Sequence, residues 1–154
     1  MASIRERIVA AAVVALNTGA PVGVPQAERE RLAAVDPNVD LPSIIVFPVH
    51  DVPEQVGGDG GPLVRSRLTL TVECRAAGTA SVRPSQATDP LFVWVVKTLV
   101  GTRLPDGSGG FLTHFINQGE TTFSYEQGEA PYCLAAIEMT AVYQQLVADP
   151  ESRV

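Results

Sequence analysis

The stretch VRSRLTLTVECR, residues 64 to 75, carries the strongest periodic signal in the chain and decides its fold class. Two sets of side chains alternate strictly along it. One set is mostly apolar, and it comprises Val64, Ser66, Leu68, Leu70, Val72 and Cys74. The other set is polar, and it comprises Arg65, Arg67, Thr69, Thr71, Glu73 and Arg75. Because successive side chains of a strand point to opposite faces, this pattern predicts a long strand with one buried face.

A glycine-rich segment, GGDGG at residues 57 to 61, stands directly before this strand. A phosphate-binding loop requires the order strand, glycine loop, helix, so that the helix N-terminus faces the anion. Here the glycines lead into a strand, no Gly-Lys-Ser/Thr follows them, and Asp59 would repel a phosphate. We therefore predict a flexible arm, Val56 to Pro62, between two strands.

The first third of the chain predicts one helix, a long connection and one strand. Ser3 and Glu6 have capping-box spacing and begin a helix that runs to Leu16 and is expected to be mostly covered. Residues 19 to 42 are rich in Pro, Gly and Ala and predict a long connection with one helical turn at AERERLAAV. SIIVFPV, residues 43 to 49, predicts a buried strand, with its proline at an edge position or strand end.

The remainder predicts one more helix and three strands. Residues 78 to 87 are predicted to be a linker, and Asp89-Pro90 is predicted to begin a helix that ends at Gly101. After the turn PDGSGG, the segments FLTHFIN and ETTFSYEQ predict two short strands joined as a hairpin at Gln118-Gly119. APYCLAAIEMTAVYQQL alternates again and predicts a long strand, and residues 146–154 are expected to form a frayed tail.

These elements predict a single domain over residues 1–154 with the order α-β-β-α-β-β-β. The expected fold class is α+β, in which a mixed or antiparallel sheet carries two main helices packed on one face.

Composition excludes some classes of function. The net charge of −6 and the pI near 4.8 argue against a protein that grips nucleic-acid phosphates. Since no apolar run reaches the ~20 residues that span a bilayer, no membrane association is expected, and IVAAAVVAL is interpreted as an amphipathic opening helix. The two cysteines are far apart and lack metal-ligand spacing, which favours reduced thiols inside a cell.

Two histidines and two cysteines are the candidate residues for metal binding or nucleophilic chemistry. His50 and His114 could join Glu54 and Asp59 as metal ligands, but no motif such as HExxH or CxxC connects them. Cys74 and Cys133 both fall on apolar strand faces, where thiols are usually inert, and no Gly-x-Ser-x-Gly elbow is present.

A carboxylate pair is conceivable if Glu73 and Glu138 are cross-strand neighbours, but both also fit as solvated or interface charges. We therefore expect a protein that is not an enzyme, with no catalytic, cofactor-binding or metal-binding residues.

The polar row of the strand leaves two interpretations open. On a monomer, Arg65, Arg67, Glu73 and Arg75 form a solvated face. In an oligomer the same row can pair with acidic groups of a neighbour, because Arg suits ion pairs at interfaces. The two interpretations differ only in the state of assembly.

Taken together, the elements resemble the tail terminator proteins of long-tailed bacteriophages, also called tail completion or minor tail U-like proteins. The matching stretches cover most of residues 3 to 145 in the same order. They are SIRERIVAAAVVAL, LPSIIVFP, GGPLVRSRLTLTVECRAAG, DPLFVWVVKTL and APYCLAAIEMTAVYQ. The combination of a Gly-rich arm, a long Arg/Thr/Glu strand and a DPLxxW helix carries the resemblance.

The resemblance implies a structural subunit that assembles into a homohexameric ring on the last ring of the tail tube. Such a ring stops tube growth and presents a surface for joining the head, with the tail-tube protein and a head-closure or connector protein as partners. It implies a place in the virion at the head–tail junction, after assembly in the bacterial host cytoplasm. DNA passes through the ring without specific binding, which agrees with the acidic charge.

The residues expected at a subunit or tube interface lie in the arm and on the polar strand face. They are Val56, Gly57, Gly58, Asp59, Gly60, Gly61, Arg65, Arg67, Glu73 and Arg75. Two alternatives stay open: another neck or tail component, such as a head-closure protein or a tail-tube subunit, and a small ligand-binding host domain.

Overall fold

A computed structural model of the chain describes residues 2–31, 33–55, 63–128, 130–146 and 149–153. Two helices, α1 (Ile4–Leu16) and α2 (Pro84–Leu99), accompany six strands. The strands are β1 (Ala27–Arg29), β2 (Ser43–Gln55), β3 (Leu63–Ala77), β4 (Phe115–Glu126), β5 (Tyr132–Leu146) and β6 (Asp149–Arg153).

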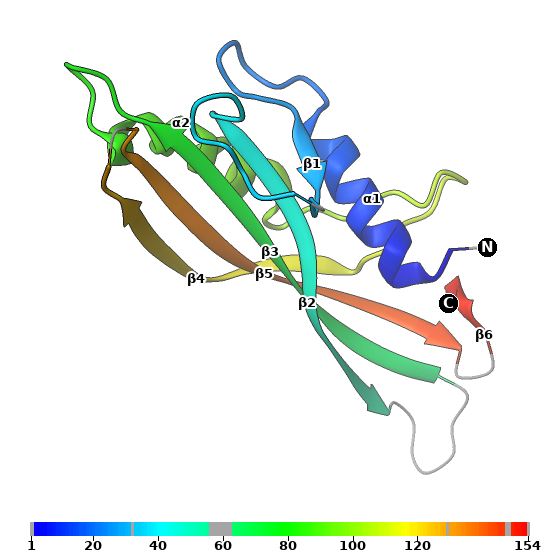
Figure 1. The fold of residues 1–154 in the computed structure, drawn as a ribbon. Coiled ribbons are helices and arrows are strands. Elements are labelled where there is room, and N and C mark those ends of the chain that lie inside the picture. Colours follow the sequence, from blue (N-terminus) through cyan, green and yellow to red (C-terminus); the bar gives the residue numbers. More distant parts are fainter. Residues whose placement is uncertain (1, 32, 56–62, 129, 147–148, 154) are drawn as a thin grey trace.

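The sheet is mixed, with the strand order β1-β2-β3-β5-β4 and β6 paired to β5. Only β1 and β2 are parallel, and every other pair is antiparallel. Both helices cover the same face of the sheet (Figure 1). The predicted α+β class, with two helices on one face of a mixed sheet, is therefore confirmed.

Strands β2, β3 and β5 continue beyond the helical layer as a twisted three-stranded ribbon (Figure 1). β1 pairs only with Ile44–Val46 of β2, and β4 begins at Phe115 opposite Val142 of β5. Past these points the sheet consists of β2 residues 52–55, β3 residues 63–67 and β5 residues 142–146, with β6 paired to the end of β5. We call this part the ribbon.

The core lies between the helices and the sheet and matches the predicted alternation of β3. Leu68, Leu70, Val72 and Cys74 are fully buried, while Arg65 and Arg67 on the other face are exposed. β5 contributes the same kind of row, with Ala135, Ile137, Met139, Ala141 and Tyr143 buried. Since each buried Leu, Ile, Val or Met side chain contributes roughly 1.5–3 kcal/mol, this contact holds the two layers together.

Helix α1 begins where the sequence predicts. The Ser3 Oγ accepts a hydrogen bond from the Glu6 N–H at 3.3 Å, which caps the N-terminus. Its predicted coverage is only partly right, because the side chain of Val14 is 65% exposed. The helix is apolar on all sides from Ile8 onward, but only one side of it faces the sheet. Neither helix in the described residues is long and apolar enough to cross a membrane.

The predicted start of the second helix at Asp89-Pro90 was wrong. α2 begins at Pro84, and the Gln86 Oε1 accepts a hydrogen bond from the Arg83 N–H at 3.1 Å. A first-turn proline has no helical hydrogen bond to lose, whereas Pro90 lies in the helix interior and leaves the Gln86 carbonyl without its usual donor. The segment contains two signals for the start of a helix, Pro84 and Asp89-Pro90, and the helix begins at the earlier one. The predicted end is right, since Gly101 with a φ of 74° follows the last residues.

The predicted hairpin at Gln118-Gly119 was also wrong. FLTHFIN and ETTFSYEQ contribute to one strand, β4, and both of its halves pair with β5. The register shifts between Gln118 and Thr121, so the extra residues form a bulge and not a turn. A glycine flanked by polar residues is typical of both a hairpin turn and a bulge. The pairing of both halves of β4 with β5 identifies a bulge here.

Three further segments differ from expectation. In the 19–42 connection, the described part of AERERLAAV contains strand β1 in place of a helical turn. β2 extends past Pro48 to Gln55, with a register shift between Pro48 and His50. Within the expected frayed tail, residues 149–153 form β6 against β5, while 147, 148 and 154 lie outside the described residues.

Candidate functional site

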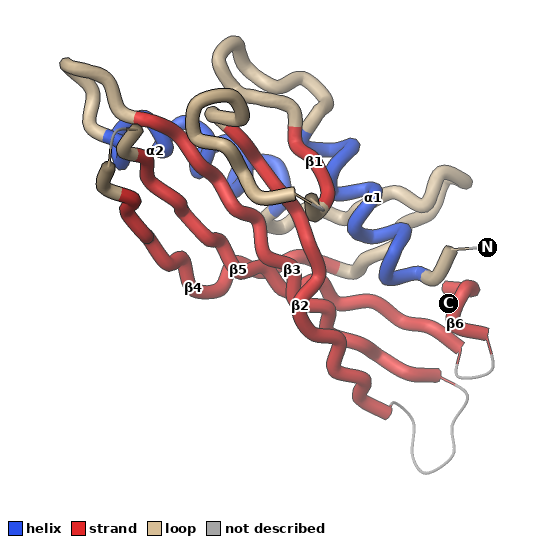
Figure 2. The backbone as a smooth tube through the Cα atoms, in the orientation of Figure 1, coloured by secondary structure: helices blue, strands red, loops and turns tan. Residues whose placement is uncertain are grey.

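Arg65, Arg67, Glu73 and Arg75 alternate with the buried side chains of β3, so they lie on the face of the sheet opposite the helices. Figure 2 shows this sheet in red and the helices in blue. Cross-strand register sorts the side chains of that face into rows. Near the helical layer, Glu73 of β3 lies between Ile45 of β2 and Ala136 of β5. Further along, Thr69 lies between His50 and Thr140, and most of these side chains are polar or small. We call this surface the open face.

The ribbon end of the open face carries two exposed arginines. Arg65 lies between Glu54 of β2 and Gln144 of β5 in the register, and Arg67 lies between Val52 and Val142. Among the described residues, no ion pair includes either arginine. Two solvated guanidinium groups on a projecting strand are available to an acidic partner.

The other two predicted residues of the row are engaged within the molecule. Glu73 and Arg75 form an ion pair whose side chains are only 19% and 15% exposed. The Arg75 Nη1 is buried and lacks a hydrogen-bond partner among the described atoms. Glu73 and Glu138 are not directly opposite each other, because Glu138 faces Thr71 in the register. Glu73 and Glu138 are therefore not the directly opposed carboxylate pair that the sequence suggested.

The glycine arm is the remaining part of the predicted interface. Val56, Gly57, Gly58, Asp59, Gly60 and Gly61 lie outside the described residues. The flanking strands are described, and Gln55 of β2 pairs with Val64 of β3.

A buried polar contact at the base of the ribbon was not predicted. The Tyr143 hydroxyl donates a hydrogen bond to the Asp51 Oδ2 at 2.7 Å, which links β5 to β2 across β3. Burial raises the pKa of Tyr143, and the hydrogen bond to Asp51 raises it further. The Asp51 Oδ1 is buried with no hydrogen-bond partner among the described atoms. The sequence gives no direct signal for this pair, because the two residues are 92 positions apart and meet only through the register.

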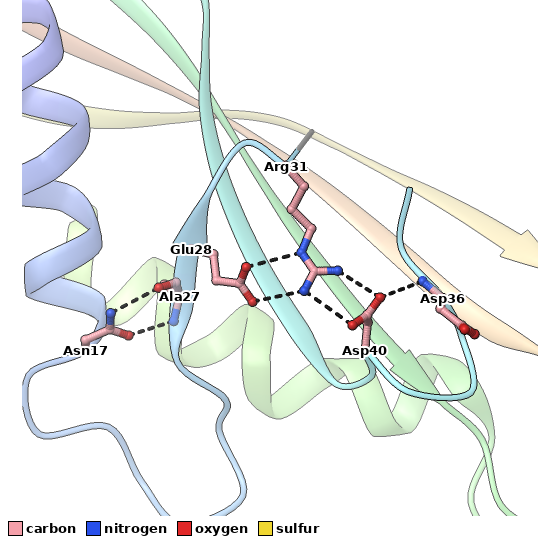
Figure 3. A network of polar contacts seen from close by, with 6 residues as sticks. All are labelled: Asn17, Ala27, Glu28, Arg31, Asp36 and Asp40. Carbon is pink, nitrogen blue, oxygen red and sulfur yellow. Dashed lines mark hydrogen bonds and ion pairs between the residues drawn. The ribbon is translucent and has the colours of Figure 1, made fainter. Parts of the chain in front are cut away.

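A second polar network surrounds β1 at the edge of the sheet (Figure 3). The Asn17 side chain accepts a hydrogen bond from the Ala27 N–H at 2.6 Å and donates one to the Ala27 carbonyl at 3.1 Å. It thereby replaces a neighbouring strand for β1. The Arg31 guanidinium lies between Glu28 and Asp40, at 3.2 Å and 2.8 Å, and attaches the following loop to β1. The pKa of Asp40 is lowered mainly by Arg31.

The described residues carry little that could perform chemistry. Cys74 and Cys133 are both buried, and burial raises the pKa of the Cys74 thiol to about 12 against a smaller opposing effect of Arg75. A protonated, inaccessible thiol is a poor nucleophile. In the part of the chain that the structure describes, no three His, Cys, Asp or Glu side chains are grouped to hold a metal ion.

A groove of 610 Å³ runs along the exposed side of α1, and small apolar side chains line most of it, including Ala10, Ala11, Val14 and Leu112. Substrate pockets combine apolar walls with a few convergent polar groups that orient the ligand. The polar lining residues are Arg7, Thr18 and Asp106, and the Arg7 guanidinium donates a hydrogen bond to the Asp106 carbonyl at 3.3 Å. We assign no reaction to this groove.

Comparison with known proteins identifies no family for this chain, so its function is argued from the fold and from these surfaces. A scan of protein-family models finds no match to this chain, and a search of curated proteins finds none.

Proposed function

We propose that this chain is a structural subunit of a bacteriophage tail, a tail terminator that forms a homohexameric ring on the end of the tail tube. The ring stops growth of the tube and presents the surface that joins the head. The resemblance described from the sequence motivates this proposal, and the α+β fold agrees with it.

The observation that carries the proposal is the ribbon with its two solvated arginines. Three strands leave the helical layer together, so the exposed guanidinium groups of Arg65 and Arg67 stand away from the core. A strongly projecting, charged element adds little to the stability of a monomer, because exposed ion pairs and charges contribute about 0–1 kcal/mol each. The same element projects from the core and can contact a neighbouring subunit.

The open face and the acidic charge fit a ring around DNA. The chain has a net charge of −6, so a channel built from several copies does not attract phosphates as a whole. Head-to-tail contacts between identical subunits close into a ring when the rotation between neighbours divides a full turn. Neither feature requires a catalytic residue.

The test is assembly of the purified chain, alone and with tail tubes. Light scattering is expected to give a mass six times that of the 16.3 kDa chain, and negative-stain images are expected to place one ring at a tube end. A strict monomer that never caps tubes contradicts the proposal. Open tubes formed by this chain alone would instead identify a tail-tube subunit, and exclusive binding at the portal end would identify a head-closure protein.

A further inference from the structure

Strand β4 leaves one edge of the sheet open. Among the described residues it pairs only with β5, and Figure 1 shows no described helix or strand beside its other edge. Proteins usually protect an open edge with proline or lysine, yet residues 115–126 contain neither. On the opposite side of the sheet β2 carries Pro48 and Pro53, whereas β4 is interrupted only by its bulge between Gln118 and Thr121. The contrast indicates that the β4 edge is covered by a partner in the assembled state.

Two aromatic side chains on β4 point to a protein partner. Phe123 is 52% exposed and Tyr125 is 55% exposed, although their register partners Ala135 and Cys133 are buried. Half-exposed aromatic residues are enriched at the centres of protein interfaces, and arginine stacks well on their faces.

Exposed acidic side chains on and beside β4 favour a partner with a basic surface. Glu120, Glu126 and Glu138 are exposed, and no ion pair within the described residues includes them. At the bulge, a Cβ on Gly119 would lie 3.0 Å from the Glu138 Oε1, so this carboxylate covers the bulge itself. The β4 edge therefore offers carboxylates and aromatic rings together.

The matching basic surface lies at the other end of the same molecule. Arg65 faces Gln144 of β5, whereas Glu126 faces Tyr132. The intervening length of β5 spans about 40 Å at the usual rise of a strand, so Arg65 cannot reach Glu126 within one chain. Two different complementary surfaces on one chain favour a head-to-tail contact between copies.

We propose that the ribbon of one copy covers the β4 edge of the next copy. Arg65 and Arg67 then lie against the acidic side chains of β4, Glu120 and Glu126. Phe123 and Tyr125 flank the same edge from the other face of β4, because they face Ala135 and Cys133 in the register. This inference rests on the proposed ring function and identifies the two surfaces that form its subunit contact.

The test uses two charge-reversed variants. R65E/R67E makes the ribbon acidic, and E120R/E126R makes the β4 edge basic. Each variant alone brings like charges together, so the concentration needed for half-assembly is expected to rise at least tenfold in light scattering. A 1:1 mixture of the two is expected to assemble, because copies can alternate around a ring with an even number of subunits. The control R83E makes the same kind of charge change at an exposed site on another surface and is expected to assemble normally.

The outcomes separate this inference from the proposed function. Normal assembly of either variant alone, or failure of the mixture while both variants keep the native circular dichroism spectrum, overturns the inference and leaves a wild-type ring intact. A wild-type protein that stays monomeric with and without tail tubes overturns both. If a reversed variant does not fold, R65Q/R67Q and E120Q/E126Q replace the pair, and each must weaken assembly by itself.

Discussion

The hydrogen bond between Tyr143 and Asp51 is the residue-scale feature with the clearest energetic consequence. It satisfies one oxygen of a carboxylate whose other oxygen is buried without a partner among the described atoms. A buried polar group that loses its partner costs about 1–3 kcal/mol, and a charged one costs more. The contact therefore fixes β5 to β2 at the point where the ribbon leaves the helical layer.

Replacement of Tyr143 by Phe is expected to lower the free energy of unfolding by about 1–3 kcal/mol, because the Asp51 carboxylate keeps its burial but loses its donor. Urea denaturation at neutral pH measures the change. In a double-mutant cycle with Asp51→Ala, which removes the acceptor, the two changes are expected to be strongly non-additive. Additive effects would show that the hydrogen bond contributes nothing of its own.

The same substitution changes the dependence of stability on pH. Because the folded state raises the pKa of Tyr143 above its ordinary value of 10.0, the unfolded chain releases the phenol proton first as the pH rises. The contribution of this group is complete below pH 10.0 and is lost above it. The wild type is therefore expected to lose stability above that pH more steeply than Tyr143→Phe does.

At the scale of elements, Asn17 connects the end of α1 to the first strand. Its side chain both donates to and accepts from the backbone of Ala27, as a paired strand would (Figure 3). β1 has three residues and needs such a partner, since its only neighbouring strand is β2. A side-chain amide supplies both the donor and the acceptor, which a carboxylate cannot do.

Asn17→Ala is accordingly expected to destabilise the fold by about 1–3 kcal/mol, since each lost hydrogen bond contributes about 0.5–1.5 kcal/mol. Asn17→Asp keeps the acceptor only and is expected to fall between the wild type and the Ala variant. Thermal and urea unfolding measure both changes. The neighbouring exposed Thr18→Ala serves as a control for a change at the same helix end, and equal losses in Asn17→Ala and Thr18→Ala would contradict the role of Asn17.

The elements were predicted from the sequence to very different degrees. The strand at 64–75 and the helix at 4–16 were predicted well, because a long period and a capping box are local signals. β1 was missed because AERER has the composition of a helix and becomes a strand only beside β2. The β4 bulge and the start of α2 were misassigned because glycine and proline signals occur at more than one position in each segment.

At the scale of the whole molecule, charge is distributed unevenly along the sheet. The ribbon carries Arg65 and Arg67, and the far end of β4 carries Glu126. The sequence predicted the arginines as interface residues but gave no sign of a complementary edge, because that edge appears only when β4 takes its place beside β5. The alternation places Glu73 and Arg75 on one face two residues apart, and the structure adds that they form an ion pair.

Assembly through such surfaces is expected to weaken with salt. Charges exposed to solvent are screened over about 10 Å at 0.1 M ionic strength and over about 3 Å at 1 M. Light scattering at increasing NaCl concentration is therefore expected to show a rising concentration for half-assembly in the wild type. The R65Q/R67Q variant, whose ribbon lacks these charges, is expected to respond much less. Equal salt responses of the two proteins would assign the contact to apolar surface instead.

The position of β5 has a consequence for how the protein is made. β5 lies between β3 and β4 in the sheet, yet it follows both of them in the chain. Until residues 132–146 have been synthesised, β3 lacks one neighbour and β4 lacks its only one. The complete ribbon and the paired β4 therefore arise together, late in translation.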